Sequence, residues 1–238
     1  MLQQSSSPAE GELGPASEML LPAGRITLGA ALAAPLAPVG LVICAMASGS
    51  GRFSPRNRRL AAALYRARLA TLMLDLLTPA EQAVDRDTAQ HRFNVPRLAA
   101  RLIDAIDWTR RDERLASLPL GLFGVHTCAA AALVAGAERP QTVHALVVCD
   151  GRADLAGGSL WRVQAPTLLL VGEQDESALA INRRAADELA AINAVATVSG
   201  VSSAFGSSMA IDQVAALAEG WYLRHLRASP VAAALQKH

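Results

Sequence analysis

The sequence predicts one α/β domain built on a doubly wound, mostly parallel sheet, with helices on both faces and no large lid. Three observations support this fold class. Short apolar runs alternate with helical patterns along nearly the whole chain. Most runs are continuous, as in parallel strands that are covered on both faces. No internal repeat or long low-complexity insert breaks the alternation, and 238 residues are enough to bury a core of this kind.

The apolar runs have the length expected of buried strands, about five to eight residues. Residues 28–47 carry no charge and are long enough to raise the question of a membrane span. Pro35 and Pro38 divide this stretch, which favours two buried strands instead. In chain order, the predicted strands cover residues 25–32, 39–45, 70–76, 118–125, 143–149, 167–171 and 194–198.

Helical patterns lie between these runs, and two of them begin with clear start signals. Ser54 can serve as an N-cap, because Pro55 follows it at the first helical position. Asn94 can cap the next helix, whose apolar residues recur at helical spacing. The predicted helices cover residues 55–67, 95–111, 127–137, 177–192 and 211–226.

Composition limits the domain organisation and the partners. Residues 1–23, rich in Ser, Gly, Pro and Glu, predict a flexible tail without the features of a secretory signal. The domain then covers 24–228, and 229–238 form a second tail. A formal charge of +1 favours neither nucleic acid nor an anionic membrane as a partner. Three cysteines without metal-ligand spacing favour reduced thiols in a cytoplasm, and the Ala- and Arg-rich composition is typical of a bacterial protein.

The candidate site lies where the predicted strands end, because chemistry in such sheets collects at the carboxyl ends of the strands. Four segments fall there: residues 46–52, 124–128, 172–176 and 200–206. The segment 124–128 reads Gly-Val-His-Thr-Cys, follows an apolar run and opens an Ala-rich helix. It therefore occupies a strand-to-helix turn of the G-x-S-x-G kind, with His126 at the apex.

The order of the four segments is that of an oxyanion loop, a nucleophile turn, an acid loop and a base loop. Six further segments carry recognisable motifs: Ala-Ser-Gly-Ser-Gly (47–51), Ser-Pro-Arg-Asn (54–57), Leu-Asp-Leu-Leu-Thr (74–78), Gly-Leu-Phe-Gly (121–124), Ala-Pro-Thr-Leu-Leu-Leu-Val-Gly (165–172) and Trp-Tyr-Leu (221–223). With these motifs, the chain resembles the dienelactone-hydrolase-like branch of the α/β-hydrolases from about residue 21 to residue 226.

This resemblance implies a role for each position of the predicted cleft. Asp175 matches the acid of the family. His126 stands where the nucleophilic serine or cysteine belongs, and Ser203 stands where the base histidine belongs. Met46 occupies the place of the histidine that usually opens the oxyanion loop, and Cys128 replaces the second glycine of the turn. Backbone donors of an oxyanion hole would come from Thr127 and from Ala47 or Ser48.

A serine attacks only when a base takes its proton and a carboxylate orients that base. With two members replaced, the oxyanion hole alone leaves an acceleration of roughly 10³ to 10⁴ over water. We therefore expect a protein without ordinary serine-hydrolase activity, a pseudoenzyme or binding protein that can take a small-molecule ligand. The alternative is an active hydrolase of small esters or lactones that uses His126 or Cys128 with Asp175.

Other interpretations of the same residues stay open. Ser203 could attack with His126 as base, although its loop lies away from the oxyanion donors. The thiol of Cys128 lies in the first turn of a helix, which favours thiolate, but residues i and i+2 do not face each other. A metal held by His126, Asp175 and Cys128 is not required by their spacing, and neither a metal nor a cofactor is expected. Laboratory changes to an active parent would also explain the replacements.

The remaining charged groups indicate surface. The acidic residues Glu81, Asp85 and Asp87 are expected in a solvated, loop-like stretch, whereas Asp75, at a strand end, could line the cleft. Arginines at positions 56, 58, 59, 66 and 68 are spread over a helix beside aliphatic residues. They predict a solvated helix surface and no nucleic-acid footprint. The sequence does not determine the oligomeric state.

Overall fold

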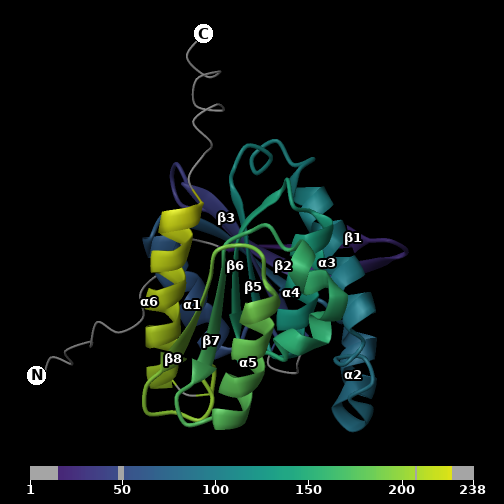
Figure 1. Cartoon of the computed structure of the whole chain (residues 1–238). Coiled ribbons are helices and arrows are strands. Elements are labelled where there is room, and N and C mark those ends of the chain that lie inside the picture. Colours follow the sequence, from purple (N-terminus) through teal and green to yellow (C-terminus); the bar gives the residue numbers. More distant parts are fainter. Residues whose placement is uncertain (1–15, 48–50, 207, 227–238) are drawn as a thin grey trace, which may run out of the picture.

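The computed structural model describes residues 16–47, 51–206 and 208–226, which form an eight-stranded mixed sheet between two layers of helices (Figure 1). The strand order is β1-β2-β4-β3-β5-β6-β7-β8. The pairs β1–β2 and β2–β4 are antiparallel, and the strands from β4 to β8 run parallel. The strands are β1 Ser17–Ala23, β2 Ile26–Ala33, β3 Gly40–Met46, β4 Leu69–Asp75, β5 Leu120–Val125, β6 Val143–Cys149, β7 Thr167–Gly172 and β8 Asn193–Val198.

Helices cover both faces of this sheet, which confirms the predicted fold class. Helices α1 (Pro55–Arg66) and α6 (Ser208–His225) pack on one face. The other face carries α3 (Val95–Thr109), α4 (Thr127–Glu138), α5 (Glu176–Glu188) and the 3-10 segment η1 (Ala153–Arg162). Two clusters of buried apolar side chains fill the space between the sheet and its two helical layers.

The start signals read from the sequence are present. Ser54 caps α1, since its Oγ accepts a hydrogen bond from the backbone N–H of Asn57 at 3.2 Å. Asn94 caps α3 in the same way, through the N–H of Arg97 at 3.1 Å. Strands β3, β4 and β5 are buried along their whole length, which explains why their sequences are continuous apolar runs.

The predicted N-terminal tail is wrong over residues 17–23, which form β1. This strand pairs with β2 from Ser17↔Leu32 to Ala23↔Ile26. It is an edge strand with mostly exposed side chains, so the sequence has no long apolar run to mark it. Pairing with a neighbouring hairpin strand, not local composition, places these residues in the sheet. The rest of both predicted tails, residues 1–15 and 229–238, lies outside the described part of the chain.

The acidic stretch expected as a solvated loop is helix α2 (Pro79–Thr88). Thr78 and Glu81 form a capping box at its start, and Glu81 pairs with Arg101 at 2.7 Å. This hydrogen bond lowers the pKa of Glu81 to about 2. Asp85 is buried and accepts from the N–H groups of His91 and Arg92 at 2.7 and 2.9 Å. The prediction failed because these acidic groups organise a helix and its following turn.

The uncharged stretch 28–47 forms most of β2 and β3, as two buried strands. In the described ranges no helix combines the length and apolar character needed to cross a membrane. Cys44, Cys128 and Cys149 are buried free thiols. The uncharged stretch therefore belongs to the core of the sheet.

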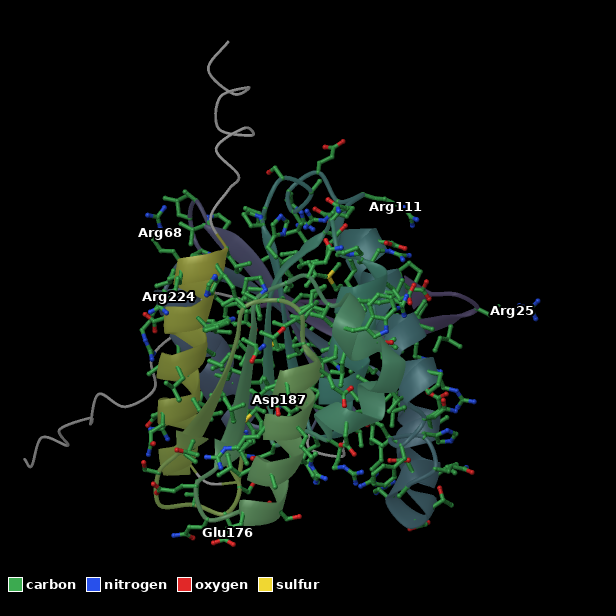
Figure 2. The ribbon with its side chains drawn as sticks, in the orientation of Figure 1. Arg25, Arg68, Arg111, Glu176, Asp187 and Arg224 are labelled. Atoms are coloured by element: carbon green, nitrogen blue, oxygen red, sulfur yellow. The ribbon has the colours of Figure 1, made fainter. Side chains whose placement is uncertain are left out.

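The parallel strands all end at one edge of the sheet, the lower edge in Figure 2. Glu176, the first residue of α5 after the β7 loop, is labelled at that edge. Arg68, which directly precedes β4, is labelled near the opposite edge. The loops that hold the candidate site therefore gather at the lower edge.

Candidate functional site

The loops at the carboxyl ends of β5 to β8 hold the polar side chains of the candidate site. His126 follows β5, Asp175 follows the end of β7 and Ser203 lies in the loop after β8. A fourth polar residue, Asp150, directly follows β6 and was missed by the sequence analysis. It carried the same signal as His126, because it is the first polar residue after a buried apolar strand.

His126 forms the apex of the turn between β5 and α4. Its backbone has φ 54° and ψ −120°, a conformation that glycine adopts readily and histidine does not. Its N–H donates to the carbonyl of Cys149 at 3.1 Å, and its carbonyl accepts from Ala129 at 3.1 Å. A Cβ on Gly124 would lie 2.5 Å from the carbonyl oxygen of Cys128, so strand and helix approach closely here. This turn leaves His126 exposed at its tip.

The surroundings of His126 favour the neutral imidazole. The residue is exposed, yet neighbouring atoms displace part of the water around its ring, and this burial lowers the pKa of His126 below its usual value. The charge of Asp150 acts in the opposite direction and raises the pKa, while that of Arg56 lowers it further. The net shift is downward, so the ring is mostly unprotonated at neutral pH and one ring nitrogen carries a free electron pair.

Ser203 is bound to Asp150 and not to Asp175. Its hydroxyl donates to Oδ2 of Asp150 at 2.6 Å. The backbone N–H groups of Ala204 and Phe205 donate to the same carboxylate at 2.9 and 2.7 Å. Three donors thus converge on one carboxylate, an arrangement suited to a negatively charged acceptor. Asp150 therefore anchors the loop that follows β8.

Arg56 holds the same loop from the side of α1. Its Nη1 donates to the carbonyl of Phe205 at 2.7 Å and to that of Gly206 at 3.3 Å. The sequence analysis assigned Arg56 to a surface cluster, and it is half-buried at the site instead. The signal that could have found it is its place in the Ser-Pro-Arg-Asn segment, directly after the loop that follows β3.

Asp175 has a different contact. Its carboxylate accepts from the N–H of Ala178 at 2.8 Å and caps α5. In the described part of the chain no hydrogen bond joins Asp175 to His126 or Ser203. The structure therefore places the three predicted triad positions along one edge of the sheet without linking them to one another.

Cys128 lies in the first turn of α4 with 1% of its surface exposed, packed in the core on the α4 face. Burial raises the pKa of its thiol well above the usual range, and the nearby charge of Asp75 raises it further. The thiol is thus protonated at neutral pH. These surroundings favour a packing role over that of a nucleophile.

The described residues predicted for the oxyanion hole lie at the end of β3 and at the beginning of α4. Met46 ends β3 with 6% of its surface exposed, and Ala47 follows it with the same exposure. Thr127 is the first residue of α4, where N–H groups have no helical carbonyl to bind. Ser48 lies outside the described residues. The N–H of Thr127 and the positive end of the α4 dipole favour negative charge beside His126.

Asp75 lies at the end of β4 and forms a separate ion pair. Its carboxylate accepts from the backbone N–H of Arg52 at 2.9 Å and pairs with the guanidinium of the same residue. Arg52 also reaches Glu18 at 3.5 Å, and its guanidinium stacks over the ring of Phe53 at 4.2 Å. Asp75 and Arg52 thus form an ion pair at the neighbouring corner of the same edge, although the Nε of Arg52 is buried without a hydrogen-bond partner among the described residues.

No group of three His, Cys, Asp or Glu side chains gathers into a set that could hold a metal ion, as far as the described ranges extend. Of the three residues weighed as metal ligands, Cys128 is buried in the core and Asp175 caps a helix. Of these three residues, His126 is exposed, Asp175 is partly buried and Cys128 is buried.

The fold and the strand-to-helix turn define an α/β-hydrolase, and comparison with solved structures agrees. A dienelactone hydrolase from Anabaena variabilis is 40% identical, with a TM-score of 0.86 over 91% of this chain and 100% of that protein. The chain belongs to this dienelactone-hydrolase family. Est1E from Butyrivibrio proteoclasticus shares the fold at 12% identity, with a TM-score of 0.72 over 87% of this chain and 98% of that one.

Relatives are also found among curated proteins. Two sequences from strains of Mycobacterium tuberculosis, both named "Putative phosphoribosyl transferase", are 43% identical over 209 residues. The match covers 88% of this chain but 46% of theirs, so the chain spans about half the length of these relatives. No family model matches the sequence.

Proposed function

We propose that this member of the dienelactone-hydrolase family lacks ordinary serine-hydrolase activity and acts as a pseudoenzyme or binding protein for a small molecule. One observation carries the proposal. The apex of the nucleophile turn is His126, and the hydroxyl at the base position, that of Ser203, donates to Asp150 at 2.6 Å. Neither a hydroxyl nucleophile at the apex nor a basic nitrogen on the last loop is therefore available.

The residue at the acid position, Asp175, supports the same conclusion. The carboxylate of Asp175, which would orient a base, accepts a hydrogen bond from Ala178 and caps α5. The hydroxyl of Ser203 already donates its hydrogen bond to the carboxylate of Asp150. A serine mechanism requires all three partners in contact, and here Asp175 and Ser203 each have another hydrogen-bond partner.

The site retains features that suit ligand binding. It lies at the carboxyl ends of the parallel strands, where sheets of this kind bind ligands. An exposed imidazole stands at the N-terminus of α4, where His126 makes no side-chain capping hydrogen bond. Such a site favours a small ligand with a carbonyl or anionic oxygen at the helix end.

Hydrolysis of an activated ester, p-nitrophenyl acetate, tests the proposal. We expect the purified protein to release p-nitrophenol no faster than buffer that contains an equal concentration of free imidazole. His126→Ala and Ser203→Ala are the matched variants, and both should give the same background rate. Hydrolysis above background that disappears in His126→Ala would contradict the proposal.

The double variant His126→Ser with Ser203→His tests whether the two replacements account for the expected lack of serine-hydrolase activity. We expect it to hydrolyse the ester faster than either single replacement, because it restores a nucleophile and a base to one cleft. An enol lactone, the substrate class of the family name, serves as the second substrate. If the double variant stays at background, the loss extends beyond these two positions, for example to the contact of Asp175 with Ala178.

A second candidate function is acyl transfer through His126 itself, and the exposed neutral imidazole at the apex favours it. In this reaction a ring nitrogen forms a bond to the acyl carbon and the ester C–O bond breaks. The leaving alkoxide takes a proton from water, and the other ring nitrogen of the acyl-imidazolium loses its proton to solvent. Water then hydrolyses the acyl-imidazole and restores the ring.

Covalent labelling separates this candidate from the first one. An acylating probe such as an activated ester should leave an acyl group on the tryptic peptide that contains His126, detected by mass spectrometry. Cys128 lies on the same peptide and is buried, so a Cys128→Ala variant should label equally. The absence of any acyl group on His126 under conditions that label free imidazole would exclude acyl transfer.

The name of the Mycobacterium tuberculosis relatives suggests a different activity. We infer that the phosphoribosyl transferase in that name belongs to the part of those proteins outside the match, because the matched residues here make an α/β-hydrolase fold. The purified chain should therefore transfer no phosphoribosyl group from its diphosphate donor to a nucleobase. Transfer by this chain alone would refute the inference.

A further inference from the structure

Two neighbouring strand ends carry the strained residues of the site. Strands β5 and β6 pair in parallel up to Val125↔Cys149, so His126 and Asp150 are the next residues on each strand. Both have positive φ angles, 54° and 49°, which non-glycine residues adopt at a cost. The N–H of His126 donates to the carbonyl of Cys149, the residue directly before Asp150. The fold therefore places the backbones of His126 and Asp150 next to each other, and the carboxylate lies near enough for its charge to act on the imidazole.

The carboxylate of Asp150 is fixed from the opposite side. Ser203, Ala204 and Phe205 supply three hydrogen bonds of 2.6, 2.9 and 2.7 Å to it. Because Arg56 binds the carbonyls of Phe205 and Gly206, the loop and its carboxylate are held from two directions. This rigid loop keeps a negative charge beside His126.

We propose that Asp150, and not Asp175, is the positioning residue for His126: it holds the last loop beside the imidazole and places a fixed negative charge next to it. The inference rests on the proposed function, since it names the residue that sets the state of the side chain at the apex. The carboxylate that acts on His126 is then the one that follows β6, and not the one that follows β7 as the sequence predicted. Asp175 remains the cap of α5.

The charges around His126 agree with this assignment. Asp150, after β6, raises the pKa of the imidazole, and Arg56, from α1, lowers it. Burial is the larger influence and lowers it further. Asp150 therefore limits how far the ring is driven toward its neutral form. Removing the carboxylate should leave burial and Arg56 unopposed.

Titration of the His126 ring signal by nuclear magnetic resonance tests the assignment without any need for turnover. The signal is identified as the one missing from His126→Gln. We expect Asp150→Asn and Asp150→Gly to shift the titration midpoint of His126 to lower pH. Glycine suits the positive φ at this position, so the second variant keeps the test available if the first one does not fold.

Three controls separate charge from structure. Asp175→Asn keeps an equally good N-cap and should leave the midpoint unchanged. Ser203→Ala loosens the loop but retains the charge of Asp150, and it should not reproduce the downward shift. Arg56→Gln should shift the midpoint upward. The assignment is overturned if Asp175→Asn lowers the midpoint, or if both folded Asp150 variants leave it unchanged, whether or not the protein hydrolyses an ester.

Discussion

Two corners of the same sheet edge use their charged groups in opposite ways. At the first corner, Asp75 and Arg52 pair with each other, and both side chains are largely buried. At the second corner, the carboxylate of Asp150 binds a loop, and the imidazole of His126 stays exposed beside it. The charges of the first corner are paired with each other, whereas the imidazole at the second corner stays exposed.

The two corners also differ in which residues take positive φ angles. The Arg52 corner uses glycine, Gly51, where the chain needs a φ of 45°. The His126 corner places two non-glycine residues, His126 and Asp150, at comparable positive φ values. Strained non-glycine residues cluster at functional sites, where the surrounding structure holds them in place. The comparison therefore predicts a stabilising role for the Arg52 corner, and it agrees with the proposed site at the His126 corner.

The largest expected effect comes from breaking the ion pair of the stable corner. Asp75→Ala leaves Arg52, 17% exposed at its side chain, with only the distant carboxylate of Glu18. We expect a loss of about 3 to 5 kcal/mol in the free energy of unfolding, because a buried charge is left uncompensated. Urea denaturation followed by circular dichroism measures it.

An exposed ion pair provides the control for this change. Arg59 and Asp212 pair at 2.9 Å, and more than half of each side chain is exposed. Asp212→Ala should cost no more than about 1 kcal/mol. Equal losses from Asp75→Ala and Asp212→Ala would remove the distinction between a stabilising corner and an ordinary surface.

The second effect comes from the hydrogen bond between Ser203 and Asp150 at the His126 corner. Ser203→Ala removes one of three hydrogen bonds to Asp150, while two backbone donors remain. We expect a loss of about 1.5 to 3 kcal/mol in the free energy of unfolding, the usual contribution of a hydrogen bond to a charged group. The exposed neighbour Ser202 is the matched control, and Ser202→Ala should change stability by less than about 0.5 kcal/mol.

The third effect concerns backbone strain, and its sign differs between the corners. His126→Gly should be about 1 kcal/mol more stable than His126→Ala, because glycine adopts φ 54° without strain. Gly51→Ala should be destabilising by about 1 kcal/mol for the same reason. Thermal and urea unfolding of the three variants measures both signs. If His126→Ala matched His126→Gly, the apex would store no strain.

The sequence was sufficient for most of the sheet because buried parallel strands have one distinctive pattern. The run 143–149 matches β6 at both ends, and the other predicted strands lie within two residues of the observed ones. Strand β1 was missed because its pairing with β2, and not its own composition, decides its state. Helix α2 was missed because Asp85 and Glu81 were taken for solvated charges and not for groups that bind backbone N–H and arginine.

The site was predictable in position but not in its contacts. The order of the loops placed His126, Asp175 and Ser203 at one edge of the sheet. An aspartate before a helix can either cap that helix or orient a base, and the sequence cannot distinguish these uses. The pairing of Ser203 with Asp150 joins residues 53 positions apart, so it depends on how the last loop folds over β6. The catalytic roles of these residues stay predictions.

The smallest expected effect is a pH dependence that belongs to the His126 corner. Burial holds the pKa of His126 below its unfolded value of about 6.5, against the opposing charge of Asp150. The unfolded chain therefore binds a proton first as the pH falls. The contribution of His126 is fully present above pH ~6.5 and is lost as the pH falls from there toward the folded pKa. His144 acts in the same direction. Its Nδ1 accepts a hydrogen bond from the N–H of Leu120, and burial lowers its pKa as well.

Urea unfolding between pH 7.5 and 5.5 should thus give a shallower decline in stability for His126→Gln than for the wild type, and His144→Gln should remove a separate part of the slope. Identical slopes for His126→Gln and the wild type would show that the apex imidazole is fully hydrated. The contrast between the paired charges of the Arg52 corner and the partly desolvated imidazole of the His126 corner would then be lost.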